Sequence, residues 1–453
     1  MNKNTFYAGV LKKFAKLFLK RHNPYIIGIT GSIGKTTARE ILSQTASEFL
    51  REVKISSSPK NFNSEIWLPL AILWITSFTP GVLGSIKAFF QALSKSVFWS
   101  GPEVLLLEYG IDNLGDMDVL LSIALPDIAI FTGLDFVHSE GLWSPDEILA
   151  EKSKLLYAAK DIVCVPAHKQ YLHEVISKIA VDVLEYSSKN GVQTDIWFDQ
   201  YEILQDEEWQ IKAEFVLDQW HDTLLAVQTN LIGEINAWYI CLSLELMQVL
   251  AYRKRMKDYT LPEVVNINYM LQPWRATFFT LETGHILLDS SYNASPKSML
   301  STLQLAVSIR NQIYPDMPLV YCLGDMNELG EFAEQEHRKM MWHVSQSAEQ
   351  IFLLGSQMKK WGSDELEKLW YMTNKIHIHQ NPRSLWSDLA QYLQKSTPSF
   401  VVFKSSQWWL YMEEAIPYVH KNISSSELCR QEKWWKVKKD IYRKSTDVLS
   451  SVS

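Results

Sequence analysis

Short apolar runs alternate with longer stretches of helical periodicity through the first third of the chain. Residues 25–29, 104–107, 128–131 and 161–165 have the length and apolar character of strands buried in a parallel sheet. Helical patterns separate these runs, which is typical of a sheet whose two faces are covered by helices. The pattern therefore predicts an α/β fold for this part of the chain.

The middle of the chain has a different pattern, and the α/β alternation resumes after it. Residues 181–232 alternate apolar and polar positions, which predicts antiparallel strands, and a strong helix is expected over residues 236–254. A boundary near Pro273 precedes a second α/β domain. We expect an N-terminal helix at 1–23, a central domain at 24–272, a smaller C-terminal domain at 273–423 and a polar tail at 424–453.

The N-terminal segment predicts an amphipathic helix with two interpretations. Residues 1–23 hold six basic side chains and no acidic one, and Phe6, Val10, Phe14 and Phe18 recur every four residues. The favoured interpretation is that the apolar face docks on the domain that follows. The alternative is a weak contact with an anionic membrane surface. For the Phe- and Trp-rich stretch 77–101, a helical hairpin packed on the core is the favoured interpretation. The alternatives are that it supplies substrate contacts or touches a membrane.

Composition excludes several classes of protein. The 453 residues are 47% hydrophobic and 21% charged, which excludes a disordered chain. The net charge of −7 argues against nucleic acid as a partner. Four well-separated cysteines fit a reducing compartment, and no apolar run reaches the roughly 18 residues of a spanning helix. The N-terminus does not have the pattern of a secretory signal. We therefore expect a cytoplasmic protein.

The sequence GITGSIGKTT concentrates three of the eighteen glycines between a predicted strand and a predicted helix. Backbone N–H groups of such a turn bind phosphate at the start of a helix, where the helix dipole favours an anion. The Lys side chain of the motif would neutralise phosphate charge, and the first Thr hydroxyl would bind Mg²⁺. The motif predicts ATP and Mg²⁺ as cofactors, held by Gly31, Ser32, Gly34, Lys35, Thr36 and Thr37.

The TGSxGKTT form of this loop resembles the Mur ligase family of ATP-dependent carboxylate–amine ligases. The similarity continues in order to about residue 414, through the segments KNFNSEIWLPL, LLLEYGIDNLGDM, FTGLDFVHSEGLWSPDEILAEK, WRATFF, LLDSSYNASPKSM, CLGDMNELGEFAEQEH and FKSSQ. The pair YNAxP and GDMxELG is similar to the MurF-type branch, which joins D-alanyl-D-alanine to UDP-N-acetylmuramoyl-tripeptide. The resemblance implies a central P-loop ATP-binding domain followed by a smaller Rossmann-like α/β domain.

The resemblance also implies roles for individual residues. Thr36, Glu108 and His138 match metal-binding positions, and Lys152 matches a lysine that the family carbamylates and that would hold a second metal. The implied catalytic set is Lys35, Glu108, His138 and Lys152. The implied nucleotide contacts outside the loop are Asn236, Arg275 and Asp289, and the implied substrate contacts are Asn61, Asn63, Asn293, Asp325, Glu328 and Lys404. For Asp325 and Glu328, a role as a helix cap or turn residue is the alternative.

The chemistry of such a ligase explains this set of residues. A free carboxylate does not react with an amine, so ATP first converts it to an acyl phosphate, which needs a phosphate cradle, a divalent metal and cationic groups. We expect a small-molecule peptidoglycan precursor and a dipeptide as substrates. Because only 23 residues precede Pro24, we expect the family's UDP-binding domain to be absent. The alternatives are a folylpolyglutamate- or cyanophycin-type ligase, or a nucleotide-binding scaffold without ligase activity. The oligomeric state stays open.

Overall fold

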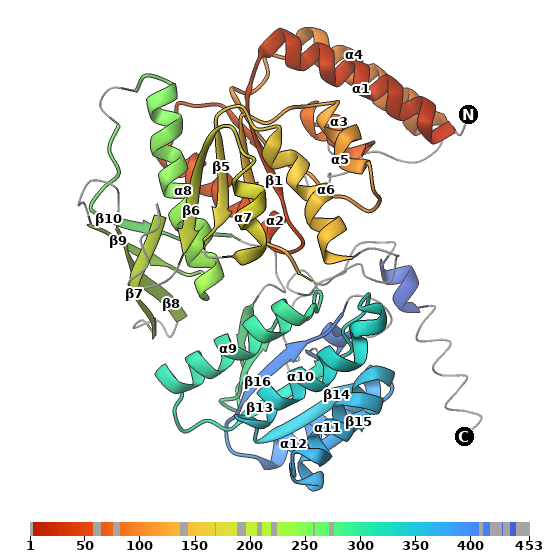
Figure 1. Ribbon diagram of the computed structural model, residues 1–453. Coiled ribbons are helices and arrows are strands. Elements are labelled where there is room, and N and C mark those ends of the chain that lie inside the picture. The colour runs from red at the N-terminus through yellow and green to blue at the C-terminus, as the bar shows by residue number, and fades with distance from the viewer. Residues whose placement is uncertain are drawn as a thin grey trace. The chain divides into compact units, whose positions relative to one another are not determined.

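The computed structural model describes residues 3–57, 65–75, 82–135, 144–167, 169–187, 196–205, 211–218, 224–256, 259–270, 276–406, 411–416, 428 and 435–440. The chain forms two compact units (Figure 1). The first comprises Met1–Leu134, Trp143–Glu202 and Lys212–Tyr269, and the second comprises Asp135–Leu142, Ile203–Ile211 and Met270–Ser453.

The first unit is built on a ten-stranded sheet in the order β10-β9-β8-β7-β6-β5-β4-β1-β3-β2. The strands are β1 (Tyr25–Thr30), β2 (Ile55–Ser57), β3 (Val104–Glu108), β4 (Ile128–Phe131), β5 (Ile162–Pro166), β6 (Asp182–Ser187), β7 (Ile196–Gln205), β8 (Ile211–Asp218), β9 (Leu224–Thr229) and β10 (Val264–Ile267). Every residue of β3, β4 and β5 is buried, as the apolar runs predict.

The prediction of antiparallel strands over residues 181–232 is wrong for part of that segment. β6 pairs in parallel with both β5 and β7, whereas β8 and β9 are antiparallel. Alternation of apolar and polar residues reports that one face of a strand is exposed. It does not report the direction in which the strand pairs.

Helices cover both faces of the first sheet. On one face, α5 (Asp116–Leu121), α6 (Pro145–Tyr157) and α7 (His173–Ile176) pack against side chains of β1, β3, β4 and β5 in one apolar cluster. α2 (Lys35–Phe49) contacts β1 and β3 and packs against α8 (Glu234–Arg253). Among the described residues, α8 alone is long and apolar enough to cross a membrane, and most of it is buried inside the unit.

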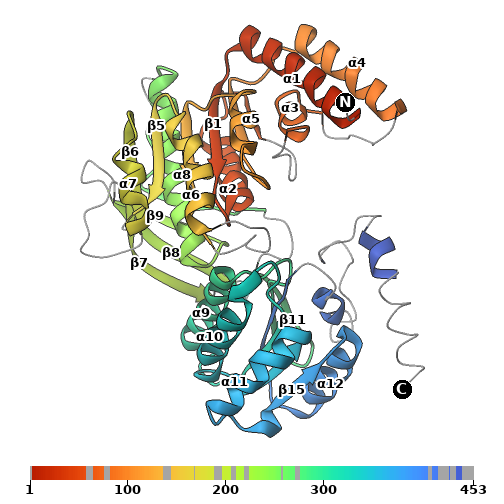
Figure 2. The ribbon, with the colours of Figure 1, turned by 45° about the vertical axis from the view of Figure 1, so that its right-hand side comes forward.

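The N-terminal helix is docked, as the favoured interpretation holds. α1 (Lys3–His22) lies beside α4 (Val82–Phe98) and contacts α3 (Trp67–Ile72) (Figure 2). Phe18 is fully buried and stacks on Trp99 with ring centroids 5.2 Å apart, and Phe14 meets Phe89 edge to face at 5.4 Å. The described part of the 77–101 segment forms one helix that pairs with α1, rather than a hairpin of its own.

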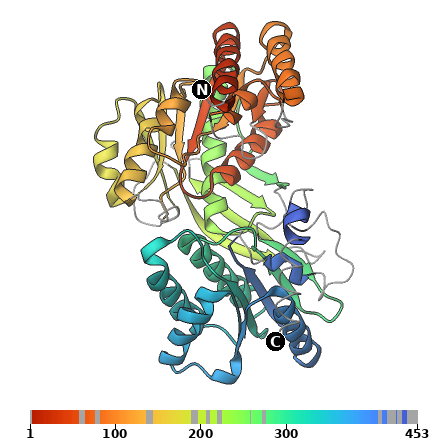
Figure 3. The same ribbon diagram turned by 90° about the vertical axis from the view of Figure 1, so that its right-hand side faces the viewer.

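The second unit has a six-stranded sheet in the order β11-β12-β16-β13-β14-β15. Its strands are β11 (Thr277–Thr280), β12 (Ile286–Asp289), β13 (Leu319–Gly324), β14 (Gln350–Leu354), β15 (Ile376–His379) and β16 (Phe400–Lys404), and its α-helices include α9 (Pro296–Gln312), α10 (Ala333–Ser345), α11 (Ser363–Lys368) and α12 (Pro382–Lys395). Only the edge strand β11 is antiparallel to its neighbour. Helices lie on both sides of this sheet (Figure 3), so the predicted α/β class is confirmed for both units.

Candidate phosphate-binding site

The glycine-rich loop follows the carboxyl end of β1 and leads directly into α2. Gly31 and Gly34 have φ angles of +145° and +81°, a region that side chains rarely adopt. Gly34 is the N-cap of α2, and no side chain among the described residues caps that helix. The loop thus leads into the amino end of a helix, where the helix dipole favours an anion.

Neither glycine position has room for a side chain. A Cβ atom at Gly31 would lie 2.1 Å from Thr132 Oγ1, and one at Gly34 would lie 2.1 Å from the hydroxyl oxygen of Tyr239. Tyr239 is on α8 and is almost completely buried. The phosphate loop is therefore confined between the residue after β4 on one side and α8 on the other.

Two lysines share the carbonyl of Gly31. Lys35 Nζ donates to Gly31 O at 2.7 Å, and Lys152 Nζ, from α6, donates to the same oxygen at 3.2 Å. Lys152 is 4% exposed. Its burial, and secondly the positive charge of Lys35, lower the pKa of Lys152 well below its ordinary value, which favours the neutral amine.

Glu108 ends β3 at the same edge of the sheet. β1 and β3 are parallel neighbours with Ile29 paired to Glu108, so the carboxylate lies beside the start of the loop. The Thr36 hydroxyl donates to Glu108 Oε2 at 3.2 Å, and Arg39 Nε forms an ion pair with Oε1 at 2.9 Å. Glu108 is 1% exposed, so this pairing compensates a buried charge.

Arg39 is a residue that sequence reasoning missed. It lies three positions after Thr36 on α2, so both side chains lie on the same helix face, and both reach Glu108. That spacing is the signal that could have found it. Among the described residues, no group of three or more His, Cys, Asp and Glu side chains could hold a metal ion. The predicted ligand His138 lies outside the described residues, as do Asn61, Asn63 and Arg275.

Asn236 lies in the first turn of α8, three positions before Tyr239. Its side-chain amide donates to the carbonyl of Ile232 at 2.8 Å. Because the two residues share one face of α8 and Tyr239 touches the phosphate loop, Asn236 lies on the side of the helix that faces the nucleotide motif.

In the second unit, three residues of the predicted ligand-binding set lie at or just after the carboxyl ends of neighbouring strands. Asp289 ends β12, and its Oδ1 accepts the N–H of Ser291 at 2.9 Å. Lys404 ends β16 and donates to Ser290 Oγ at 3.2 Å, while Asn293 Oδ1 accepts the Ser406 hydroxyl at 3.3 Å. Loops at this edge of an open α/β sheet are where ligands usually bind.

Asp325 has a different environment from these three. Its carboxylate accepts the N–H groups of Gln357 at 3.2 Å and Met358 at 2.7 Å, and burial raises its pKa. These contacts favour the structural alternative for Asp325, because they tie the end of β13 to the segment after β14. Glu328 adopts a φ of +64°, which marks a turn.

His337 holds the loop that contains Asp325 and Glu328. Its Nε2 accepts the N–H of Met326 at 3.0 Å, and its Nδ1 lies 2.6 Å from the carbonyl of Ala333. The ring is fully buried, and burial lowers the pKa of His337 to about 4. The loop is thus fixed by a neutral imidazole.

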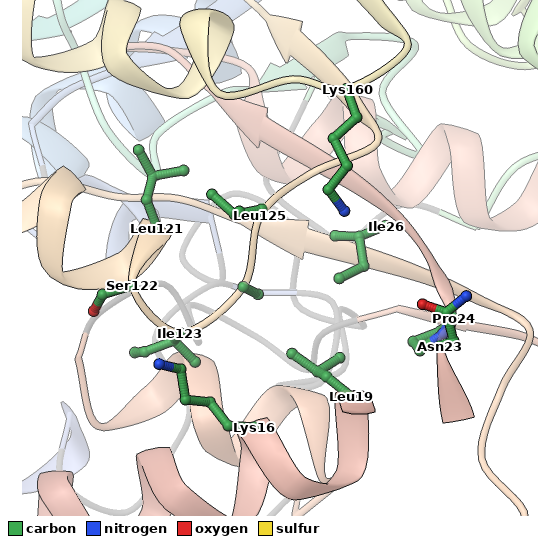
Figure 4. A pocket seen from close by; sticks show the side chains of 11 residues that line it. Lys16, Leu19, Asn23, Pro24, Ile26, Leu121, Ser122, Ile123, Leu125 and Lys160 are labelled. Carbon is green, nitrogen blue, oxygen red and sulfur yellow. The ribbon is translucent and has the colours of Figure 1, made fainter. Parts of the chain in front are cut away.

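A pocket of about 500 Å³ lies at the opposite edge of the first sheet (Figure 4). It surrounds the amino end of β1, whereas the phosphate loop follows the carboxyl end. Apolar side chains and two lysines line it: Lys16, Leu19, Asn23, Pro24, Ile26, Leu121, Ser122, Ile123, Ala124, Leu125 and Lys160. It is therefore separate from the phosphate-binding site.

The loop, its lysines and the Thr36–Glu108 pair on a parallel sheet have the arrangement of α/β proteins of the P-loop class. Residues 29–247 match the family described as Mur ligase middle domain. The resemblance to Mur ligases that the motifs indicate is confirmed.

Relatives named as UDP-N-acetylmuramoyl-tripeptide–D-alanyl-D-alanine ligases match the chain. The UDP-N-acetylmuramoyl-tripeptide–D-alanyl-D-alanine ligase of Borreliella burgdorferi is 25% identical over 357 residues, which are 77% of this chain and 66% of that protein. The chain thus matches just under two thirds of that relative's length. MurF from Acinetobacter baumannii is similar in fold with a TM-score of 0.70, 19% identity and coverage of 91% of this chain and 80% of that one. The ADP complex of MurF from Thermotoga maritima is similar in fold with a TM-score of 0.69 and 20% identity. The match covers 91% of this chain and 83% of that one.

A Gly34→Ala substitution is expected to raise the Kd for ATP at least tenfold, which is about 1.4 kcal/mol. The new Cβ would meet the Tyr239 hydroxyl and strain a positive φ, so the loop would have to move. Isothermal titration calorimetry with ATP measures the change.

Gly115→Ala is the matched control for that experiment. Gly115 is also the N-cap of a helix and has a φ of +91°, but a Cβ there would contact nothing within 4 Å. This variant should bind ATP as the wild type does. Equal affinity in the Gly34→Ala protein would contradict the confinement of the loop.

The contribution of His337 to stability should depend on pH. Because its pKa is lower in the folded state than the ordinary 6.5, the unfolded chain binds the proton first. The contribution of the neutral ring to the free energy of unfolding is therefore fully present above pH 6.5 and is lost as the pH falls toward 4. Between pH 7 and pH 5 the free energy of unfolding should fall by roughly 2 kcal/mol on this account. A His337→Asn protein keeps a hydrogen-bond acceptor but cannot titrate. Urea unfolding of both proteins at the two pH values tests this, and parallel pH profiles would refute it.

Proposed function

We propose that this chain is an ATP-dependent carboxylate–amine ligase of the MurF type. In this proposal it joins D-alanyl-D-alanine to UDP-N-acetylmuramoyl-tripeptide in peptidoglycan precursor synthesis, in the cytoplasm. The observation that carries the proposal is the meeting of four side chains at one edge of the first sheet. Lys35 and Lys152 share the Gly31 carbonyl, and Thr36 donates to Glu108 beside them.

The first step is transfer of the γ-phosphoryl group of ATP to the substrate carboxylate. The N–H groups at the start of α2 bind the phosphates, and Lys35 stabilises the charge on the transferring group. The dipeptide amine then attacks the acyl carbon, the carbon–oxygen bond to phosphate breaks, and inorganic phosphate leaves. The amine loses a proton as the amide forms.

Thr36 and Glu108 are the residues that would hold Mg²⁺. A hydroxyl and a carboxylate are hard oxygen donors of the kind that Mg²⁺ prefers, and the two already lie 3.2 Å apart. The ion would supply electrostatic stabilisation of the phosphoryl oxygens. Arg39 holds the carboxylate of Glu108 in place through its 2.9 Å ion pair. His138 remains a proposed ligand on the basis of the family resemblance.

Lys152 is proposed to act as a carbamate. A neutral amine adds to CO₂, which forms a nitrogen–carbon bond, releases one proton and converts the side chain to an anion with two oxygen ligands. Burial and the neighbouring charge of Lys35 both favour the neutral amine that this reaction needs. The modification would also remove the repulsion between the two lysines at Gly31.

The remaining contacts are assigned by position and by family resemblance. Asp289, Asn293 and Lys404 are proposed to contact nucleotide or substrate, because they lie at the carboxyl ends of β12 and β16. Asn236 is proposed to contact the nucleotide from α8. Asn61, Asn63 and Arg275 keep their predicted roles on the resemblance alone, and Glu328 is proposed to contact the substrate from its turn.

Two alternatives remain, and one observation favours them. The family's adenine-binding motif on α8 keeps Asn236 but has Ile235 and Tyr239 in place of its His and second Asn. A ligase with another acid and amine would retain the phosphate chemistry with a changed adenine contact. A nucleotide-binding scaffold would retain the loop without turnover.

The proposed activity is tested by ADP release from ATP in the presence of UDP-N-acetylmuramoyl-tripeptide and D-alanyl-D-alanine. We expect turnover that requires both substrates and falls by about 100-fold or more in a Lys35→Ala protein, because a preorganised cation is lost from the transferring phosphate. Lys178→Ala, an exposed lysine of the same unit, is the control and should turn over normally. Turnover only with another acid–amine pair would favour the first alternative, and ATP binding without any turnover would favour the second.

The carbamate has its own test. Lys152→Ala should abolish activity, and added bicarbonate or a short carboxylate such as acetate should restore part of it by supplying the missing anion. ¹³C NMR of wild-type protein in labelled bicarbonate should show a carbamate signal that the variant lacks. A Lys152→Ala protein that is fully active without additives would refute the assignment.

A further inference from the structure

The pair of helices α1 and α4 carries charge of one sign. Neither helix contains Asp or Glu. Their basic side chains are Lys3, Lys12, Lys13, Lys16, Lys20 and Arg21 on α1, and Lys87 and Lys95 on α4. The chain as a whole has a net charge of −7, so this concentration of positive charge is local.

Among the side chains of α4 that the structure describes, four large apolar ones are exposed and the fully buried ones are small. Its buried positions Ala88, Ala92 and Ser96 recur every four residues and are small. Phe90 and Phe98 are 62% and 82% exposed. A helix that only covers a core turns its large apolar side chains inward and its polar ones outward, because burial of large apolar groups stabilises its packing.

The exposed apolar surface extends from α4 to α1. Phe89, Leu93 and, on α1, Leu17 are each about two-fifths to one-half exposed. The edge-to-face contact between Phe14 and Phe89 joins the two helices at this surface. Several large exposed apolar side chains on two paired helices that also carry lysines are typical of a binding surface rather than of a solvated one.

The pocket of Figure 4 lies beside the same helix. Lys16 of α1 and Lys160 line it from two sides, and Leu19, Ile26 and Leu125 supply apolar walls. Lys160 is paired with Asp127 at 3.1 Å. Such a mixture of ammonium groups and apolar side chains fits a lipid phosphate and the first part of its chain better than it fits a protein segment.

We propose that the α1–α4 pair is a membrane-docking surface that lies on an anionic lipid bilayer. The apolar side chains of α4 enter the boundary between headgroups and acyl chains, and the lysines of both helices contact lipid phosphates. α4 lies in the surface and does not span the bilayer, because it has 17 residues and includes Lys87 and Lys95. This goes beyond the proposed ligase activity and does not depend on it.

The test is co-sedimentation of the full chain with lipid vesicles. Wild-type protein should sediment with vesicles of phosphatidylcholine and phosphatidylglycerol, and should stay in solution with phosphatidylcholine alone. Binding should weaken as salt increases, since the lysine–phosphate attraction is screened. Phe90→Ser/Phe98→Ser and Lys13→Glu/Lys20→Glu should each reduce the partition coefficient more than tenfold.

Matched substitutions in the second unit are the controls. Trp370→Ser/Met372→Ser removes two side chains that are 94% and 63% exposed, and Lys339→Glu/Lys359→Glu reverses two exposed charges. Both controls should bind vesicles as the wild type does. ATP binding by each α1–α4 variant shows that the first unit is still folded.

Three results would overturn the proposal. The first is wild-type protein that does not bind the anionic vesicles. The second is unchanged binding by the α1–α4 variants. The third is a concentration-dependent dimer, seen by analytical ultracentrifugation without lipid, that Phe90→Ser/Phe98→Ser dissociates, because the patch would then be an interface between two copies of the chain. None of these readouts depends on ligase turnover.

Discussion

The parallel pairing of β1 with β3 is the constraint on which the phosphate-binding site depends. It sets Ile29 opposite Glu108, so the buried carboxylate ends level with the start of the glycine-rich loop. The loop then turns into α2, whose first residues bring Thr36 and Arg39 to that carboxylate. A shift of one residue in this register would turn the Glu108 side chain to the other face of the sheet and separate it from Thr36.

The same edge of the sheet collects cations as well as the carboxylate. Lys35 comes from the loop and Lys152 from α6, two elements far apart in sequence, and both donate to Gly31 O. The carbonyl accepts from both side chains, so the positive charge of Lys35 lies beside the buried amine of Lys152 and helps to keep it neutral. The loop geometry and the lysines therefore act together: the backbone supplies hydrogen bonds and the side chains supply charge.

The sequence predicted the α/β class and the strand–loop–helix setting of the phosphate motif because both rest on local patterns. The apolar runs of β1, β3, β4 and β5 are long enough to identify buried strands. The three-residue spacing of Thr36 and Arg39 on α2 was a usable signal for Arg39, but no local pattern could predict that Tyr239 closes the loop, because that contact depends on how α2 and α8 pack. The direction of β6 was missed for the same reason: a strand's pattern shows which face is exposed, and its neighbours decide the direction of pairing.

Asp325 shows that one motif residue can have two roles in the second unit. The GDMxELG segment predicts a substrate contact, which stays a prediction, and the carboxylate also accepts two backbone N–H groups after β14. A motif can persist because it fixes a loop as well as because it touches a ligand. Only the three-dimensional partners of a side chain distinguish these cases.

The small inward side chains of α4 have a consequence for local stability. Ala88, Ala92 and Ser96 bury little apolar area, so the inner face of this helix contributes little to the free energy that holds it on the first unit. Its described contacts with α1 include the ring pair Phe14–Phe89, and Trp99, one residue beyond the helix, stacks on Phe18. The helix pair should therefore open at a lower free energy than the sheet, as a separate unit of local unfolding. Amide hydrogen exchange would then distinguish α4 from β1, although both belong to one folded unit.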